Sequence, residues 1–152
     1  MRFLIQRVSH AEVAVDGAVV GSIQRGLLVF VGLGAADNEA LFTPAIEKIT
    51  NLRIFRDAEG KMNLSLRDVG GEILAISQFT LYADARKGRR PSYTDAMPPA
   101  QAEEMFERFV AALRAQFSGV VQTGRFGADM KISLLNDGPV TIWLDSAQMN
   151  WA

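Results

Sequence analysis

Three hydrogen-bonding side chains interrupt an apolar segment that begins at Ile73. Every residue from Ile73 to Ile76 is apolar, and Ser77, Gln78 and Thr80 then follow. Apolar residues on both faces predict a strand that begins inside the protein. Because an unpartnered buried polar group costs about 1–3 kcal/mol, these side chains either brace neighbouring loops or present polar groups to a ligand. Both interpretations stay open at this point.

A cluster of four cations follows in Arg86-Lys87-Gly88-Arg89-Arg90, and no other part of the sequence concentrates charge as strongly. Tyr82 and Tyr93 flank this cluster. Cations contact phosphates and aromatic rings stack on bases, so the pattern is typical of binding to single-stranded nucleic acid. A solvated surface loop without a ligand is the alternative interpretation.

The segment Asn136-Asp137-Gly138-Pro139 is unusual for a turn. Asn-Asp-Gly alone predicts an ordinary hairpin loop. Pro139 removes a hydrogen-bond donor at the start of the next strand and allows a cis peptide bond. A cis bond would give the Gly138 and Pro139 carbonyls an arrangement that suits a rigid stereochemical gate. The sequence leaves the isomer open.

Other common catalytic motifs do not fit. Gly32-Leu33-Gly34 separates a predicted strand from a predicted helix, but Asp37 stands where a dinucleotide-binding motif has its third glycine. The segment is therefore interpreted as a plain strand–helix turn. The sequence contains no Walker A loop and no Gly-x-Ser-x-Gly elbow. His10 is the only histidine, and we expect a solvated surface residue there.

The composition excludes further classes. The absence of cysteine and the single histidine exclude disulfides, thiolate or multi-histidine metal sites and cysteine nucleophiles, and no cofactor or metal is expected. With 16 basic and 17 acidic residues, the net charge of −1 excludes a protein that coats nucleic acid by charge alone, and no DNA partner is expected. Apolar runs are too short for a membrane helix or a signal peptide, so the expected location is the cytoplasm.

The hydrophobic pattern predicts the elements that position these residues. Strands are expected through residues 2–33, with a hairpin at Asp16-Gly17, and helices over 38–51, with Asp37 as N-cap, and from Pro98-Pro99 onward. Short strands are expected near 52–56 and 62–66, a longer one over 72–82, and three within 119–145, the last two joined by residues 136–138. The prediction is one domain, residues 1–152, an α/β layered sandwich of largely antiparallel and mixed sheet with two main helices packed on it.

From Met1 to Ser146 the chain resembles the bacterial D-aminoacyl-tRNA deacylases, the D-tyrosyl-tRNA deacylase family. The motifs that carry the resemblance occur in one order and register: Gln6–Val8, Asn51–Phe55, Gly60–Asn63, Ser77–Leu81, Lys87–Ser92, Gly124–Met130 and Asn136–Thr141. Tyr93, where the family often has phenylalanine, is a mild departure.

The resemblance implies an ester hydrolase that removes D-amino acids, and also glycine, from tRNA. It implies a homodimer in which the dipeptide Gly138-Pro139, with a cis bond, reaches into the partner's active site. There its carbonyls would hold the α-amino group of a D-residue and exclude an L side chain. Arg7 is implied to support this dipeptide.

The resemblance also implies where the chemistry occurs. The catalytic segment comprises Ser77, Gln78, Phe79 and Thr80, and further substrate contacts come from Met130, Lys87 and Arg90. In the family's favoured account the 2′-hydroxyl of the terminal adenosine assists water, while main-chain donors around Phe79 and Thr80 stabilise the reacting ester. Thr80 is a weak candidate nucleophile, because no convincing base lies beside it in the sequence.

Two rival classes make different predictions. A non-catalytic RNA-binding module would use the same cations and aromatic rings, but it would be indifferent to the chirality of the amino acid. A structural homodimer would use the Gly138-Pro139 turn only as an assembly contact. Turnover with a preference for D-esters is expected of the enzyme alone.

Overall fold

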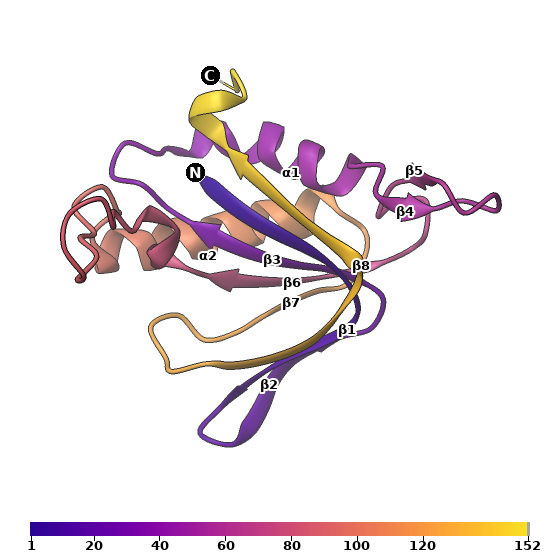
Figure 1. Ribbon diagram of the computed structural model, residues 1–152, viewed down its shortest axis with the longest axis horizontal. Helices are drawn as coiled ribbons and strands as arrows, with labels where there is room; N and C mark the ends of the chain where they lie inside the picture. The colour runs from indigo at the N-terminus through magenta and orange to yellow at the C-terminus, as the bar shows by residue number, and fades with distance from the viewer. Residues whose placement is uncertain (152) are drawn as a thin grey trace.

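A mixed six-stranded sheet carries both main helices on one face in the computed structural model, which describes residues 1–151 (Figure 1). The strands of this sheet are β1 (Arg2–Val15), β2 (Ala18–Ile23), β3 (Gly26–Gly32), β6 (Glu72–Ser77), β7 (Val121–Thr123) and β8 (Lys131–Asp145). The helices are α1 (Phe42–Asn51) and α2 (Pro99–Gln116), with short 3-10 turns η1 (Glu39–Leu41), η2 (Phe79–Tyr82) and η3 (Ser146–Gln148). A separate ribbon contains β4 (Phe55–Arg56) and β5 (Met62–Leu64). The predicted α/β class, mixed sheet and two main helices are confirmed.

Strand β1 organises the sheet. Its first half pairs antiparallel with β3 and its second half with β2, while β8 pairs with it from Arg2 to Ala14. Strands β3, β6 and β7 are parallel to one another. The β1–β2 turn is the predicted one, because Asp16 and Gly17 adopt the positive φ values of 50° and 79° that a tight hairpin requires.

The two faces of the sheet are covered differently. On one face α1 and α2 pack against β1, and the ring of Phe109 lies 5.7 Å from Phe3 and 5.4 Å from Phe42. On the other face the buried cluster contains strand residues only, among them Val13, Leu28 and Ile76. This second face is therefore closed by the curvature of the sheet rather than by helices. No helix within residues 1–151 is long and apolar enough to cross a membrane.

The predicted start of the first helix is wrong. Asn38, not Asp37, accepts the capping hydrogen bond, from Ala40, and it begins η1 rather than the helix. Helix α1 begins only at Phe42. Proline lacks an N–H and is tolerated in a first helical turn, so Pro44 favours a helix that starts just before it.

The predicted strand over residues 72–82 is too long, because β6 ends at Ser77. The N–H of Gln78 makes a last contact with the carbonyl of Val31, at 2.8 Å, and the chain then turns into η2. Strand alternation therefore does not apply beyond Ser77. Phe79, the first residue of η2, is 56% exposed.

The predicted hairpin at residues 136–138 is also wrong, and the region 119–145 forms two strands instead of three. Strand β8 continues through this segment with a large bulge, since Asn136 pairs with Val8 and Thr141 with Gln6. Four residues, 137–140, thus stand opposite the single residue Arg7. The surplus residues leave the ladder, and this displacement exposes Gly138 and Pro139.

Candidate active site

A pocket of about 580 Å³ opens at the carboxyl ends of the parallel strands β3 and β6. It brings together four of the predicted catalytic and substrate-binding residues: Ser77, Gln78, Phe79 and Met130. Its other walls come from residues 31 and 33, 76, 93, 96–99, 102, 126–129 and 132. The volume falls in the range of small-molecule sites, and the carboxyl edge of parallel strands is where α/β sheets place their ligands.

Aromatic side chains shape the mouth and one wall of this pocket. The rings of Phe79 and Tyr93 meet edge to face at 4.9 Å, and both remain exposed. Phe126 lies 6.3 Å from Phe106 of α2, which ties the 126–130 loop to the helix layer. The exposed pair offers a π-surface on which a base or an aromatic side chain can stack.

Thr80 lies beside this pocket, in η2, and its side chain is exposed. The amide Nε2 of Gln78 donates to its hydroxyl. No carboxylate or imidazole among residues 1–151 is hydrogen-bonded to that hydroxyl, and no group of three or more acidic or histidine side chains in this range could hold a metal ion. The N–H groups of Phe79 and Thr80 open a helical turn, so they lack acceptors within it.

The cationic loop is a shaped structure beside the pocket. Two backbone hydrogen bonds between Asp84 and Ser92, of 2.8 and 2.9 Å, close its base. Arg86 folds back on Asp84, and its side-chain hydrogen bonds lower the pKa of that carboxyl to about 2. The charge of Arg86 is thereby paired, whereas Lys87 and Arg90 lie exposed in the loop.

Tyr82 does not have the stacking role that the sequence suggested. Its hydroxyl donates to Asp37, and the guanidinium of Arg2 covers its ring at 4.3 Å. Burial, reinforced by the charge of Asp37, raises the pKa of the Tyr82 hydroxyl above its ordinary value, which keeps it a donor. Of the two tyrosines that flank the cation cluster, Tyr93 remains a candidate for stacking, together with Phe79.

A second cluster surrounds the bulge in β8. Arg7 is 2% exposed, and it donates to the carbonyls of Asp137, at 2.8 Å, and Ile54, at 2.6 Å. The side-chain oxygen of Asn136 accepts from the N–H of Val140, at 2.9 Å, and so closes the bulge. The Gly138–Pro139 peptide bond is cis.

The two clusters are separate within one chain. Gly138, Pro139 and Arg7 do not line the pocket, which β8 reaches only at its start, through Ile132. Gly138 lies six positions after Ile132, which is about 20 Å along an extended strand. The Gly138-Pro139 dipeptide therefore lies in a different part of the chain from the pocket.

Sequence reasoning missed most of the apolar pocket wall. Met97, Ala102 and Phe126 line it, but in the sequence they look like ordinary core residues. Gly124–Met130 did appear among the motifs of the resemblance, and that was the available signal for this wall. The hydrogen bonds of Asp37 with Gly34 and Tyr82 were not predicted, because an acidic residue before a helix is typical of an N-cap.

The fold and this pocket define a class: a one-domain α/β protein with a ligand site at the carboxyl edge of parallel strands, lined mainly by apolar and neutral polar groups. The chain belongs to the D-Tyr-tRNA(Tyr) deacylase family, whose model matches residues 4–145.

Relatives described as D-aminoacyl-tRNA deacylases match nearly the whole chain. A "D-aminoacyl-tRNA deacylase" of Ruegeria pomeroyi is 60% identical over 146 residues, which is 95% of this chain and 99% of that protein. A "D-aminoacyl-tRNA deacylase" of Thermosipho africanus is 54% identical over 149 residues, which is 98% of this chain and 99% of that protein. A solved structure titled "c-Myc DNA Unwinding Element Binding Protein" superposes with a TM-score of 0.91 at 40% identity, covering 96% of this chain and 99% of that one.

Proposed function

We propose that this protein hydrolyses the ester bond of D-aminoacyl-tRNA and releases free tRNA and the D-amino acid. The observation that carries the proposal is the pocket that unites Ser77, Gln78, Phe79 and Met130 in a chain of this family. A pocket of about 580 Å³ has room for an aminoacyl group together with part of a nucleoside.

The stereochemical gate is Gly138-Pro139 of a second copy of the chain. Both residues are exposed on the bulge of β8, and the bulge lies away from the pocket of its own chain. In a twofold dimer each chain would place its dipeptide at the pocket of the other. The carbonyls would bind the α-amino group, and an L side chain would collide with main chain. Glycine has no side chain to exclude, so glycyl-tRNA is proposed as a second substrate.

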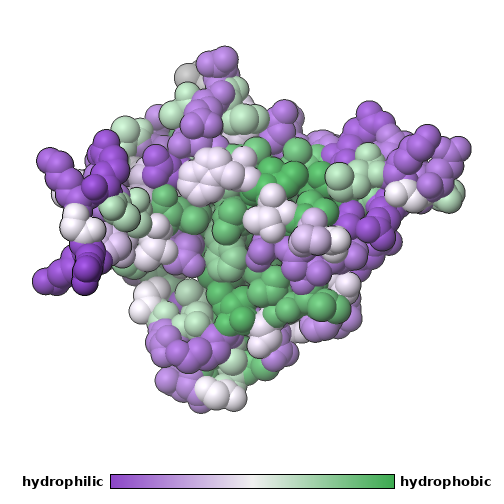
Figure 2. Space-filling view, viewed as in Figure 1, coloured by the Kyte–Doolittle hydropathy of each residue, from purple (hydrophilic) through white to green (hydrophobic). Residues whose placement is uncertain are grey.

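The surface around β8 supports such a dimer. Hydrophobic side chains form a band across the face over which β8 runs (Figure 2). Leu135 is 54% exposed and Trp143 44% exposed, and both lie on this strand. Extended exposed apolar surfaces of soluble proteins are typical of interaction sites. A second copy of the chain packed over β8 would bury these exposed apolar side chains.

The chemistry proceeds without a protein nucleophile. The N–H groups at the start of η2 stabilise the oxyanion, and the 2′-hydroxyl of the terminal adenosine assists the attacking water. Gln78 and Thr80 position the substrate, and Ser77 orders the strand end. The Gln78–Thr80 hydrogen bond supports this division of roles, because it holds the hydroxyl without activating it.

Thr80→Ala is therefore expected to retain the rate of D-tyrosyl-tRNA hydrolysis to within about tenfold, since it removes only a positioning contact. Loss of a true nucleophile costs on the order of ten-thousandfold or more. Thr80→Ser, which keeps the hydroxyl, is the matched control and should restore the rate. A ten-thousandfold loss in Thr80→Ala, rescued by serine, would make Thr80 the nucleophile.

Replacing both Lys87 and Arg90 with alanine is expected to raise KM for D-aminoacyl-tRNA about tenfold and to leave kcat unchanged. These cations would contact phosphates near the acceptor end of the tRNA. Each such contact steepens the slope of log K for binding against log salt concentration by roughly 0.7–0.9. Initial rates at several salt concentrations measure both effects. Lys61→Ala, on the distant β4–β5 ribbon, is the control. An unchanged salt slope in the double variant would remove the loop from the substrate-binding site.

Turnover separates the enzyme from the RNA-binding module. D-Tyrosyl-tRNA in a hundredfold excess over protein should lose its ester completely. If the ester half-life were instead unchanged while tRNA bound, the protein would be a binding module and the proposed function would fail.

A further inference from the structure

The two glycines of Gly32-Leu33-Gly34 lie directly against η2. A Cβ added at Gly32 would approach the Cβ of Leu81 to 2.9 Å, and one at Gly34 would approach Cζ and the hydroxyl of Tyr82 to 2.7 Å. A side chain at either position would push the turn away. The absence of side chains at Gly32 and Gly34 therefore lets η2 pack closely against this segment. This packing explains the two glycines without any role in nucleotide binding.

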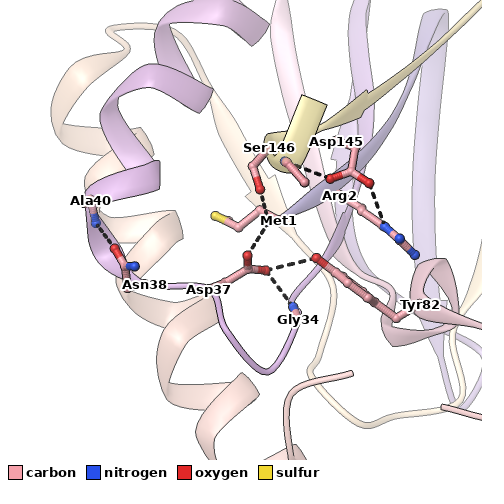
Figure 3. Close-up of polar contacts among 10 residues, drawn as sticks. Met1, Arg2, Gly34, Asp37, Asn38, Ala40, Tyr82, Asp145 and Ser146 are labelled. Atoms are coloured by element: carbon pink, nitrogen blue, oxygen red, sulfur yellow. Dashed lines mark hydrogen bonds and ion pairs between the residues drawn. The ribbon is translucent and has the colours of Figure 1, made fainter. Parts of the chain in front are cut away.

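Asp37 links η2 to the Gly32–Gly34 segment through hydrogen bonds (Figure 3). One carboxylate oxygen accepts from the N–H of Gly34, at 2.6 Å, and from the hydroxyl of Tyr82, at 3.1 Å. The other accepts from the amino group of Met1, which also donates to Ser146. A part-buried carboxylate that makes three charge-assisted or polar contacts fixes all its partners firmly.

Arg2 holds the same turn from another side. Its Nη1 donates to the carbonyl of Leu81, at 3.0 Å, while its guanidinium lies 4.3 Å from the centre of the Tyr82 ring. Its Nε is anchored in turn by Asp145, at 3.0 Å. The second half of η2 is thus held by Gly34, Asp37 and Arg2, and the first half carries Phe79 and Thr80.

We infer that Asp37 and Tyr82 are positioning residues for the hydrolytic reaction, acting through η2. The inference rests on the proposed role of the Phe79 and Thr80 main chain at the oxyanion. A single helical turn of four residues cannot fix its own orientation, so tertiary contacts must do so. Because a displacement of about 1 Å costs roughly a hundredfold in rate, the contacts at Leu81 and Tyr82 set the position of the donors that precede them.

Tyr82→Phe and Asp37→Asn test this inference. The first removes only the hydroxyl and keeps the ring against Gly34, and the second keeps the shape of the carboxylate. In single-turnover hydrolysis of D-tyrosyl-tRNA we expect the rate constant to fall about tenfold in Tyr82→Phe and further in Asp37→Asn, with KM within twofold of the parent. Glu39→Gln, whose carboxylate pairs with Arg108 on the exposed surface, is the matched control and should keep the parent rate.

A merely structural role would give a different result. Rates are measured at a temperature where thermal melts show every variant folded, and amide NMR signals of Phe79 and Thr80 are recorded in parallel. We expect those two signals to shift in both variants and to stay in place in Glu39→Gln. Parent-like rate constants and unshifted signals, with only a lower Tm, would overturn the inference. An inactive parent would instead overturn the proposed function, and the amide signals would then decide the positioning role alone.

Discussion

Arg7→Ala is expected to lower the melting temperature by about 6–12 °C and to reduce hydrolysis of D-tyrosyl-tRNA at least a hundredfold. The side chain is buried and donates to the carbonyls of Asp137 and Ile54. Leaving the buried carbonyl of Ile54 and the part-buried carbonyl of Asp137 without this donor costs about 3 kcal/mol, and a chain of this size loses roughly 2–4 °C per kcal/mol.

The loss of activity has a separate cause. Arg7 is the single residue opposite the four-residue bulge, so its removal frees the segment that presents Gly138 and Pro139. Thermal melts and initial rates, compared at a temperature where both proteins are folded, separate the two effects. Arg56→Ala removes an exposed cation from β4 and is the control, with parent-like values expected for both. An Arg7→Ala protein that melted lower but kept its rate per folded molecule would show that the bulge has no part in the reaction.

Gly138→Ala is expected to reduce D-ester turnover about a hundredfold and also to lower the stability of the protein. Gly138 has a φ of +144°, and an added Cβ would lie 2.8 Å from Cγ2 of Val140 and 3.0 Å from Nη2 of Arg7. The backbone must therefore shift, and the two carbonyls of the gate shift with it. Gly17→Ala is the matched control, because φ is +79° there but nothing lies within 4 Å of an added Cβ. It should lose stability without losing rate.

Mixed dimers test whether the gate acts across the interface. Gly138→Ala keeps the pocket intact, whereas Phe79→Ala keeps the gate intact but removes one ring of the aromatic pair at the pocket mouth, so a dimer with one chain of each contains one complete site. Each variant alone should have low activity, and random mixing should restore about a quarter of the parent activity. If activity stayed at the level of the separate variants while mixed dimers formed, the gate would not serve the partner's pocket.

The fold was largely predictable where local physics decides it. Asp-Gly in a predicted hairpin and Pro-Pro before an amphipathic stripe gave the β1–β2 turn and the start of α2, because each depends on neighbouring residues. The α/β class followed from the predicted set of strands together with two helices. These features do not require knowledge of distant contacts.

The errors lie where distant contacts override local preference. Asn-Asp-Gly is typical of a hairpin, but β1 pairs with both sides of it, and the buried Arg7 converts the turn into a bulge. Strand β6 ends earlier than predicted because the chain turns into η2, which packs closely against Gly32 and Gly34. The polar end of the strand made one part of the pocket wall predictable, whereas apolar wall residues such as Met97 and Ala102 cannot be told from core residues in the sequence.

Hydrolysis of D-tyrosyl-tRNA and L-tyrosyl-tRNA, measured side by side with catalytic amounts of the protein, tests the central claim most directly. The proposed gate of Gly138 and Pro139 predicts rapid loss of the D-ester while the L-ester decays at its spontaneous rate. Glycyl-tRNA, included as a third substrate, should be hydrolysed as well. Equal loss of the D- and L-esters would leave a deacylase but contradict the gate.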